Sequence, residues 1–565
     1  MTATVAPPRP AAATAAPPAR TSWWRRPLLA AALLLAIYGG LSLANDPRAF
    51  MASDVGGKVA TLRAMDARGD LHPDLGYWAH ALDPRGALYP IVKTDHRGSQ
   101  WVNVTTLPML YAAYPLYELG GVRAILVLPM LGGVLTALGA RALARRLGGR
   151  GDLAFWLVGL ATPVVVYSLD FWEHTLGLAA TIWAVVLLLD VADRTAGWRA
   201  AAAAGALFGV AATMRTEALV YAAVAVVVVV WAGRPWPRRD LVRDGAAAAG
   251  ALLLPLLANT GLEVLAFGSP YRASRTSTAA SGAASSLALR ANEAVSTTIG
   301  LNGFDTALDW LLGAMIVLGL AVAALRLLAP RRDGRLVGWL ALGVAALGYG
   351  LRLRAGLSFL PGLLVCSPLV VVGLVVANRR PAFRRPVAIA LLALPLVWLA
   401  QFGGGAGPQW GGRYELTSGL LLAVVAAVAL ERVPWRGAVA MIAVSAAATG
   451  VGLAWLAVRT HDYGRTTSAV AAEPGPVVTT SGALYHFWRE GGASYTPTRP
   501  WLTAPRRADL AAAVRLLDRL GATSFTLVSQ NRAQAPPALG PYRRRTGRSR
   551  ALVETIRIEV TRYAR

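Results

Sequence analysis

The sequence predicts an all-α polytopic membrane protein, with about 13 transmembrane helices and a small C-terminal α/β exterior domain. Hydrophobic residues make up 55% of the 565 residues and charged residues only 15%, and the mean hydropathy is +0.47. Runs of Ala, Leu, Val and Gly recur at lengths close to the span of a bilayer core. A soluble chain could not bury this much apolar surface, so soluble enzymes, secreted disulfide scaffolds and disordered proteins are excluded.

The net charge of +26 comes from arginines that lie mostly in short clusters between the apolar runs. Such clusters indicate membrane topology and no nucleic-acid partner. By the positive-inside rule, the N-terminus and the Arg-rich alternate loops are cytoplasmic. The single cysteine, Cys366, excludes an intrachain disulfide and a Cys-based metal site.

Residues 1–26 predict a disordered cytoplasmic tail, rich in Ala, Pro and Thr. The first apolar run, 27–44, indicates an uncleaved first helix; a signal peptide is the alternative, because Ser42-Leu43-Ala44 resembles a cleavage site. A first exterior loop follows at 45–118. Later apolar runs predict spans near 121–140, 153–168, 175–190, 200–214, 218–233, 245–265, 307–328, 336–350, 358–377, 386–402, 416–430 and 437–457.

An odd number of spans places the C-terminus outside, after a transmembrane domain that covers residues 27–457. Residues 458–565 then form the small exterior αβ domain. Its pattern predicts strands at 477–480, 525–528 and 553–560, with a helix at 507–520 closed by Gly521.

In the first exterior loop, Val55, Val59, Leu62 and Met65 recur at helical spacing after a Ser53 cap. We expect an amphipathic helix on the membrane surface, with its polar face toward a cavity. Asp54 in its first turn is a candidate general base for an acceptor hydroxyl. The alternative is an acid that only stabilises the helix dipole.

The chain has two lysines, Lys58 and Lys93, and both lie in this loop. Lys58 is four residues from Asp54, so it either pairs with Asp54 or contacts substrate. Lys93, close to His96 in a charged segment, is a candidate for binding phosphate. An exposed charged turn is the alternative for both Lys93 and His96.

The strongest local signal is the exterior turn that holds Asp170, Glu173 and His174 between apolar spans. Each charge at hydrocarbon depth costs roughly 2.5 to 3.5 kcal/mol, so these groups must face a cavity or one another. A structural network is the alternative to a functional role. A divalent metal is a third, less favoured interpretation, because the sequence fixes neither ligand number nor geometry.

Two further exterior turns carry candidate substrate-binding residues. One holds Arg215 and Glu217; the other is a glycine-rich turn that ends in Trp410, Arg413 and Tyr414. An arginine fork suits phosphate, and glycine allows the backbone to approach a ligand closely. Ordinary interfacial aromatics are the alternative for Trp410 and Tyr414.

Taken together, these motifs resemble the GT-C superfamily of polyprenyl-phosphate-sugar-dependent glycosyltransferases. The similarity is to the branch that includes protein O-mannosyltransferases and aminoarabinose transferases. The residues that carry it are Ser53 to Lys58, Tyr89-Pro90, Leu107 to Gly121, the Asp170 turn, Arg215 and Trp410 to Tyr414, in that order along residues 27–430. The segment from Lys93 to Trp101 departs from the pattern, because it lacks the Pro-Gly that many relatives carry there.

The resemblance implies an inverting displacement at the anomeric carbon of a lipid-linked sugar donor. Asp54 would take the proton of an extracytoplasmic acceptor, and Lys93, Arg215 and Arg413 would bind the departing phosphate. Asp170, Glu173 and His174 would orient the acceptor or hold those cations. No metal cofactor is obligatory in such a reaction, because phosphate is already a good leaving group.

Two other functions stay open at this stage. A flippase or transporter of a lipid-linked sugar would also use exterior charges, but it predicts inverted repeats or broken helices with ionisable groups near the bilayer midplane. The sequence shows no such symmetry, and its acids cluster at one surface. A non-catalytic scaffold would present the basic C-terminal segment to an acidic polymer. Such a scaffold does not need the Asp170 to His174 turn.

Overall fold

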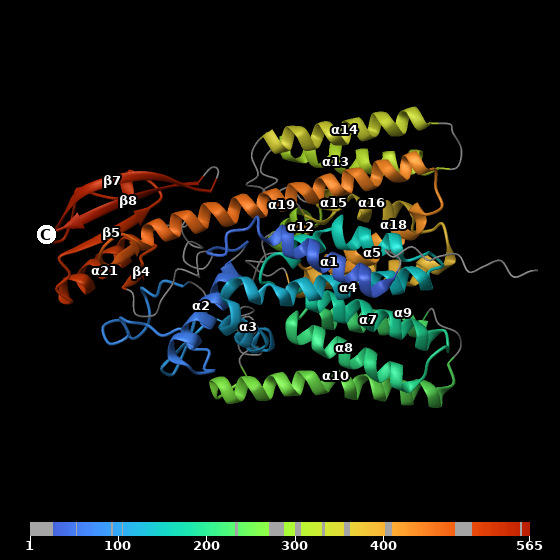
Figure 1. The fold of residues 1–565 in the computed structure, drawn as a ribbon, viewed down its shortest axis with the longest axis horizontal. Helices are drawn as coiled ribbons and strands as arrows, with labels where there is room; N and C mark the ends of the chain where they lie inside the picture. Colours follow the sequence, from blue (N-terminus) through green and yellow to red (C-terminus); the bar gives the residue numbers. More distant parts are fainter. Residues whose placement is uncertain are drawn as a thin grey trace, which may run out of the picture.

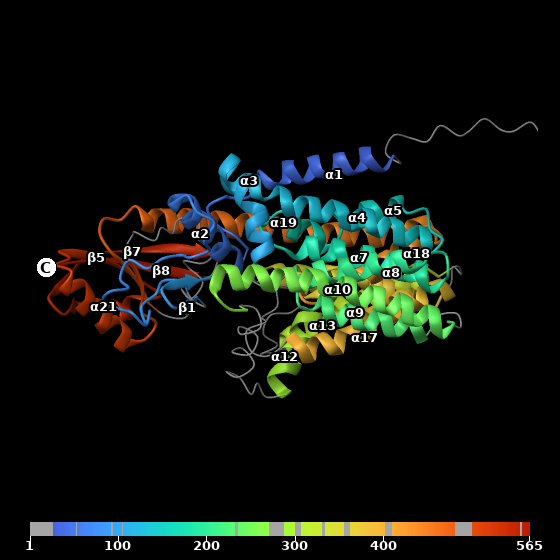
Figure 2. The same ribbon diagram turned by 90° about the horizontal axis from the view of Figure 1, so that it is seen from below.

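The computed structural model describes residues 26–51, 53–91, 94–103, 106–231, 236–270, 287–299, 307–329, 334–354, 362–401, 410–480, 500–553 and 556–565. Most helices lie along one long axis, and a sheet stands at one end of the bundle (Figure 1). The same arrangement is seen after a 90° turn (Figure 2). The predicted N-terminal tail lies outside the described residues, as do Lys93 and most of 268–305.

Every apolar run that the sequence predicted contains a helix. The bundle helices are α1 (Pro27–Ser42), α4 (Val127–Arg146), α5 (Asp152–Leu160), α6 (Pro163–Ser168), α7 (His174–Ala192), α8 (Trp198–Met214), α9 (Ala218–Trp231), α10 (Arg238–Phe267), α12 (Leu287–Ile299), α13 (Ala307–Leu327), α14 (Arg335–Arg354), α15 (Leu363–Cys366), α16 (Pro368–Val376), α17 (Arg384–Gln401), α18 (Leu416–Leu430) and α19 (Trp435–Ala471). Within the described parts of the chain, seven helices are long and apolar enough to cross a membrane, and three shorter apolar helices join them. The chain is a multi-pass membrane protein.

Two predicted spans are each divided by a proline. The run at 153–168 becomes α5 and α6, and the run at 358–377 contains α15 and α16. Thr162 and Ser367 precede these prolines with ψ of 169° and 77°, outside the helical region. Proline disfavours helical geometry in the residue before it, so the helix stops at each of these points.

The segment predicted as the first exterior loop is more helical than expected. It holds α2 (Ser53–Arg68), the short strands β1 (Asp95–Arg97) and β2 (Gln100–Val102), and α3 (Leu107–Ile125). The predicted apolar face of α2 is confirmed, since all four of its residues are fully buried. However, other sides of the helix are also enclosed, with Lys58, Ala60 and Thr61 no more than 1% exposed, while Asp66 to Arg68 in its last turn are exposed. Protein therefore surrounds most of the helix, and its expected position on the membrane surface stays a prediction.

The C-terminal segment forms a mixed sheet of six strands in the order β4-β3-β5-β8-β7-β6. The strands are β3 (Val477–Thr479), β4 (Trp501–Thr503), β5 (Ser524–Ser529), β6 (Ala538–Leu539), β7 (Tyr542–Val553) and β8 (Ile556–Ala564). Strands β3, β4 and β5 are parallel, whereas β5-β8-β7-β6 are antiparallel. Helix α21 (Arg507–Arg519) buries Leu510, Val514 and Leu517 in the core that it shares with the sheet.

Helix α19 joins the membrane bundle to this sheet without a break. It has 37 residues, about 56 Å at 1.5 Å per residue, against about 30 Å for a bilayer core. The predicted boundary between 457 and 458 falls inside this helix. Beyond it, Tyr463 and Val470 pack against Val528, Ile558 and Val560 of the sheet.

Candidate functional site

The candidate site lies where the first turn of α2 meets the turn before α18. Nη1 of Arg413 donates to Oδ2 of Asp54 at 3.2 Å, although the two residues are 359 positions apart. The Asp54 side chain is 20% exposed and that of Arg413 9%. The structure therefore brings together the predicted base and one of the predicted phosphate-binding cations.

The Arg413 turn has a backbone that requires glycine. Gly411 and Gly412 have φ of 79° and 65°, in the left-handed region. A Cβ on Gly411 would lie 2.5 Å from Cγ of Pro163. This tight turn holds the Arg413 guanidinium 2.6 Å from the Tyr414 hydroxyl and 5.5 Å from the ring centroid of Trp172.

Trp410, predicted to bind substrate, packs inside the protein. Its side chain is 2% exposed and stacks on Trp455 of α19, with ring centroids 5.7 Å apart. A Cβ on Gly452 would lie 2.4 Å from the Trp410 ring, so α19 fits closely around it. These contacts anchor the turn that carries Arg413 against α19.

Glu173 binds two of the predicted cations at once. One carboxylate oxygen accepts from Lys58, and the other accepts from Nη1 of Arg215 at 3.3 Å. Burial alone favours the neutral carboxyl, but the charges of Lys58 and Arg215 hold the pKa of Glu173 below its ordinary value. Lys58 is fully buried and pairs with Glu173. The spacing of four residues in the sequence had instead indicated a pair with Asp54.

Arg215 extends from the C-terminus of α8 into the same region. Its backbone is extended, with φ −139° and ψ 116°, so the helix ends there. Nε donates to Oε1 of Glu217 at 2.8 Å, and the guanidinium lies 5.0 Å from the Tyr414 ring centroid. Tyr414 therefore lies against both Arg215 and Arg413.

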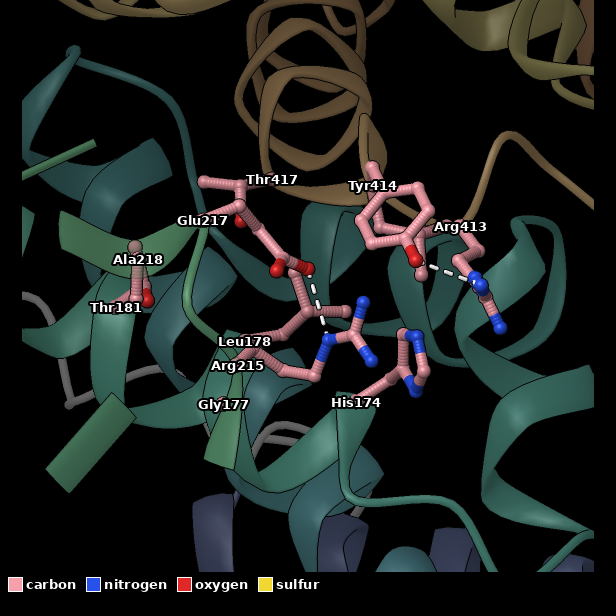
Figure 3. A pocket seen from close by; sticks show the side chains of 11 residues that line it. His174, Gly177, Leu178, Thr181, Arg215, Glu217, Ala218, Arg413, Tyr414 and Thr417 are labelled. Carbon is pink, nitrogen blue, oxygen red and sulfur yellow. Dashed lines mark hydrogen bonds and ion pairs between the residues drawn. The ribbon is translucent and has the colours of Figure 1, made fainter. Parts of the chain in front are cut away.

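A hollow opens between these side chains. In Figure 3, the side chains of His174, Arg215 and Tyr414 point toward one another across it. It is narrow, with a cavity volume of about 20 Å³ for the centres of water-sized spheres, and is lined by His174, Gly177, Leu178, Thr181, Arg215, Glu217, Ala218, Arg413, Tyr414, Leu416 and Thr417. Among the described residues, neither ring nitrogen of His174 nor Oε2 of Glu217 has a hydrogen-bond partner. The hollow thus offers two cations, an imidazole and a carboxylate oxygen to a polar ligand.

Asp170 supports the site through the backbone. Oδ2 accepts from the Met51 N–H at 2.7 Å and Oδ1 from the Phe171 N–H at 2.8 Å. Burial raises the pKa of Asp170 to about 6, against the effect of these bonds. Because the Met51 carbonyl accepts from Nε of Arg459 in α19 at 2.9 Å, the segment just before Asp54 is held on both sides.

His96 lies among aromatic side chains of the first exterior loop. It stacks on Trp101 with ring centroids 4.3 Å apart and lies edge-on to His80 at 5.5 Å. Its ring contacts thus lie within this aromatic group, and its role in binding substrate stays a prediction. Within the described part of the chain, no three His, Cys, Asp or Glu side chains form a group that could hold a metal ion.

Sequence reasoning did not single out Glu415, which directly follows Tyr414. Its side chain is fully buried, and Oε1 accepts from Nε1 of Trp398 at 2.7 Å and from the Thr298 hydroxyl at 2.8 Å. Burial raises the pKa of Glu415 to about 7. An acid directly before an apolar span was the available signal, and it would have indicated a buried, hydrogen-bonded carboxyl.

No protein-family profile and no curated protein sequence matches the chain. Among solved structures, ArnT from Cupriavidus metallidurans is 13% identical over 94% of this chain and 97% of its own, with a TM-score of 0.46. The same protein bound to undecaprenyl phosphate is 15% identical over the same shares of both chains, with a TM-score of 0.45. The archaeal oligosaccharyltransferase AglB from Archaeoglobus fulgidus, in complex with an inhibitory peptide and a dolichol-phosphate, is 13% identical over 91% of this chain and 70% of its own, with a TM-score of 0.45.

All three matches have TM-scores below 0.5 and identities of 15% or less.

Proposed function

We propose that the chain is an integral-membrane inverting glycosyltransferase. It would move a sugar from a polyprenyl-phosphate donor to an extracytoplasmic acceptor, such as a cell-envelope glycan, lipid or protein. The observation that carries the proposal is the Asp54–Arg413 ion pair beside a hollow lined by Arg215, Glu217 and His174. A carboxylate next to clustered cations at the end of a membrane bundle suits a reaction that removes a proton and releases a phosphate.

In the proposed reaction, Asp54 accepts the proton of the acceptor hydroxyl as its oxygen attacks the anomeric carbon. The new glycosidic bond forms on the face opposite the phosphate, so the configuration inverts. The bond between the anomeric carbon and the phosphate oxygen breaks, and its electron pair leaves with the lipid phosphate. Arg215 and Arg413 stabilise that developing charge.

The other charged residues would position these groups. Glu173 fixes Arg215, and Lys58 balances Glu173 inside the protein. Asp170 holds the backbone at Met51, three residues before Asp54. The unpartnered oxygen of Glu217 and the ring nitrogens of His174 are available for sugar hydroxyls. This set of residues needs no metal ion, since arginine supplies the positive charge.

The test is transfer of a labelled sugar from a polyprenyl-phosphate donor by purified protein in nanodiscs. We expect Asp54→Asn to lower the rate at least 100-fold, within the range for loss of a general base. Asp66→Asn, an exposed acid on the same helix, is the matched control and should leave the rate unchanged. Full activity of Asp54→Asn would remove Asp54 from the base role.

A second measurement separates transfer from lipid transport. Reconstituted protein in liposomes is given labelled lipid-linked sugar and acceptor extracts from cell envelope on the same side of the membrane, and movement of the lipid to the other leaflet is followed in parallel. The proposal predicts a new glycosidic bond, detected by mass spectrometry. Movement of the lipid across the bilayer without such a bond would show that the protein is a flippase and not a glycosyltransferase.

A further inference from the structure

The hairpin of β7 and β8 carries an unusual concentration of arginine. Five arginines lie on β7 and two on β8, and Glu559 is the one acid within the two strands. Arg543, Arg545, Arg548, Arg557 and Arg562 are exposed, and Arg550 is half-buried. Among the described residues, none of these seven arginines forms a salt bridge, although Arg544 and Arg545 donate to backbone carbonyls.

The register places four of these arginines on one face of the sheet, the face whose Ile558 and Val560 pack against α19. Arg543, Arg548 and Arg562 stay exposed on that face. Thr546 lies opposite Arg562, Arg548 opposite Val560, and Arg550 opposite Ile558. Residues that lie opposite each other share a face, and so do alternate residues along a strand. Arg543, opposite Ala564, falls on the same face because a register shift intervenes between Arg544 and Thr546.

These four side chains form a row, which we call the arginine row: Arg543, Arg562, Arg548 and Arg550. Neighbours in the row are diagonal across the two strands or alternate along one strand, so their backbones lie about 7 Å apart. Glu559 is opposite Ser529 and Ser549, on the other face, and cannot neutralise the row. Like charges at such positions repel one another, so the row stabilises the fold less than neutral residues would.

We propose that the arginine row binds an extended anionic polymer whose acidic groups recur along its length. Four guanidinium groups in line offer bidentate bonds to successive carboxylates or phosphates. The shared ligand chemistry is therefore an acidic polysaccharide or a phosphodiester-linked polymer. This inference does not depend on whether the chain transfers sugar.

The position of the row argues against the lipid bilayer as its ligand. The sheet lies beside the C-terminal end of α19, at the end of the molecule away from most of the bundle (Figure 1). Helix α19 is about 56 Å long, some 26 Å more than a bilayer core. The near end of the row lies lower than the end of α19, because the Ala551 carbonyl, next to Arg550, accepts from the Thr466 hydroxyl. Thr466 is roughly 18 Å beyond a bilayer core, which still exceeds the Debye length of about 8 Å.

The experiment measures binding of purified full-length protein in nanodiscs of neutral phosphatidylcholine. The probes are polygalacturonate, which carries carboxylates, and poly(glycerol phosphate), which carries phosphodiesters; dextran is the neutral polymer. The test variant replaces Arg548, Arg550 and Arg562 with Gln. The matched control replaces Arg507, Arg515 and Arg519 of α21, three exposed arginines of the same C-terminal segment, with Gln.

We expect the test variant to bind one or both anionic polymers at least tenfold more weakly, with a shallower dependence of affinity on salt. The control should change affinity less than twofold, and dextran should not bind. The polymer that loses more affinity identifies the source of the acidic groups. Asp54→Asn should bind as the wild type does, which separates this inference from the proposed transfer reaction.

Three outcomes would overturn the proposal. Equal loss in both triple variants would mean unspecific attraction to net charge. Binding only to vesicles that contain phosphatidylglycerol would assign the row to the membrane surface. Unchanged polymer binding together with aggregation of the test variant would mean that these charges only protect the exposed edge of β7 from pairing with other strands.

Discussion

At the scale of single residues, the site is a set of acids and cations whose charges balance inside the protein. Glu173 is 1% exposed and Lys58 fully buried, so neither charge has water to stabilise it. A buried pair of this kind adds little net stability, but loss of one partner leaves an uncompensated charge. The arrangement therefore makes the site sensitive to changes that preserve the size and shape of a side chain.

Glu173→Gln should lower the free energy of unfolding by about 3 to 5 kcal/mol, because Lys58 would be left as a buried charge without its acid. Thermal unfolding in detergent measures this change. Asp240→Asn is the control, since it breaks a partly exposed pair with Arg194 and should cost far less. A similar cost in the two variants would show that Glu173 is not needed to balance Lys58.

Glu415 predicts a dependence of stability on pH. Its pKa of about 7 in the folded protein lies above the ordinary value of 4.5, so the folded state favours the neutral acid. The resulting stabilisation is complete below about pH 4.5 and is lost as the pH rises through 7, by about 3 kcal/mol in all. In Glu415→Gln, which cannot ionise, the melting temperature should fall less between pH 5 and pH 8. Parallel curves for the two proteins would contradict the buried, neutral carboxyl.

Sequence alone predicted that part of this set of site residues would gather at one end of the bundle, but not how its members pair; the predicted set also included His96, which packs among aromatic side chains. Asp54, Asp170, Arg215 and Arg413 follow or precede apolar runs at one end of the bundle, and this placement was readable from topology. The partner of Lys58 was not, because i,i+4 spacing favoured Asp54, whereas tertiary packing placed Glu173 against it. The packing of Trp410 against α19 depends on a helix more than 20 residues away, which no local pattern reports.

At the scale of elements, the bundle depends on small residues where helices cross. Gly205 and Gly209 of α8 face the backbone of α10, and an added Cβ would lie 2.0 Å from the Ala248 carbonyl oxygen or 2.4 Å from that of Leu252. Figures 1 and 2 both show α8 and α10 side by side. Small residues at such crossings let helix backbones approach closely within a membrane.

Gly205→Ala should destabilise the protein by about 1 to 3 kcal/mol, because the backbone of α10 cannot move away as a flexible side chain would. Gly250→Ala, on the exposed face of α10 with no atom within 4 Å of the added Cβ, is the matched control. It should be neutral or stabilising by up to about 1 kcal/mol. The melting temperatures of the two variants measure this difference. If Gly250→Ala lowers the melting temperature as much as Gly205→Ala does, close packing at Gly205 is refuted.

The elements that sequence reasoning missed have recognisable causes. Helix α3 carries Pro115 and a backbone break at Gly120 and Gly121, and both mask its helical period. Strand β7 has arginine where a half-buried strand would alternate apolar and polar residues, so its period of two is absent. The long apolar runs, by contrast, specify helices through composition alone.

At the scale of the whole molecule, the first exterior loop and the C-terminal sheet share one hydrophobic core. Leu75, Tyr89 and Trp101 of the loop pack with Leu502 and Phe525 of the C-terminal segment. The Leu88 carbonyl accepts from the Thr503 N–H at 2.9 Å, and Nε1 of Trp78 donates to the Trp501 carbonyl at 3.1 Å. The sequence predicted these as separate parts, because their distance along the chain hides the shared core.

Leu88→Ala should therefore loosen both parts together. The lost burial and the resulting cavity cost about 2 to 5 kcal/mol. Hydrogen exchange should rise both in residues 75–91 and in β4 and β5, while exchange in α4 and α7 stays unchanged. Leu520→Ala, 48% exposed on the same C-terminal segment, serves as the control. Faster exchange in the loop alone would show that the two parts unfold independently.

The unbroken length of α19 has a mechanical consequence. The middle of this helix packs against Trp410 through Gly452 and Trp455, the next turn holds Met51 through Arg459, and its last turns support the sheet. A single residue inserted near 460 would rotate the end of α19 and the C-terminal sheet by about 100° about the helix axis and shift them by about 1.5 Å along it. The length of α19 and the rotation about its axis together set where a molecule bound on the sheet lies relative to the carboxylate of Asp54.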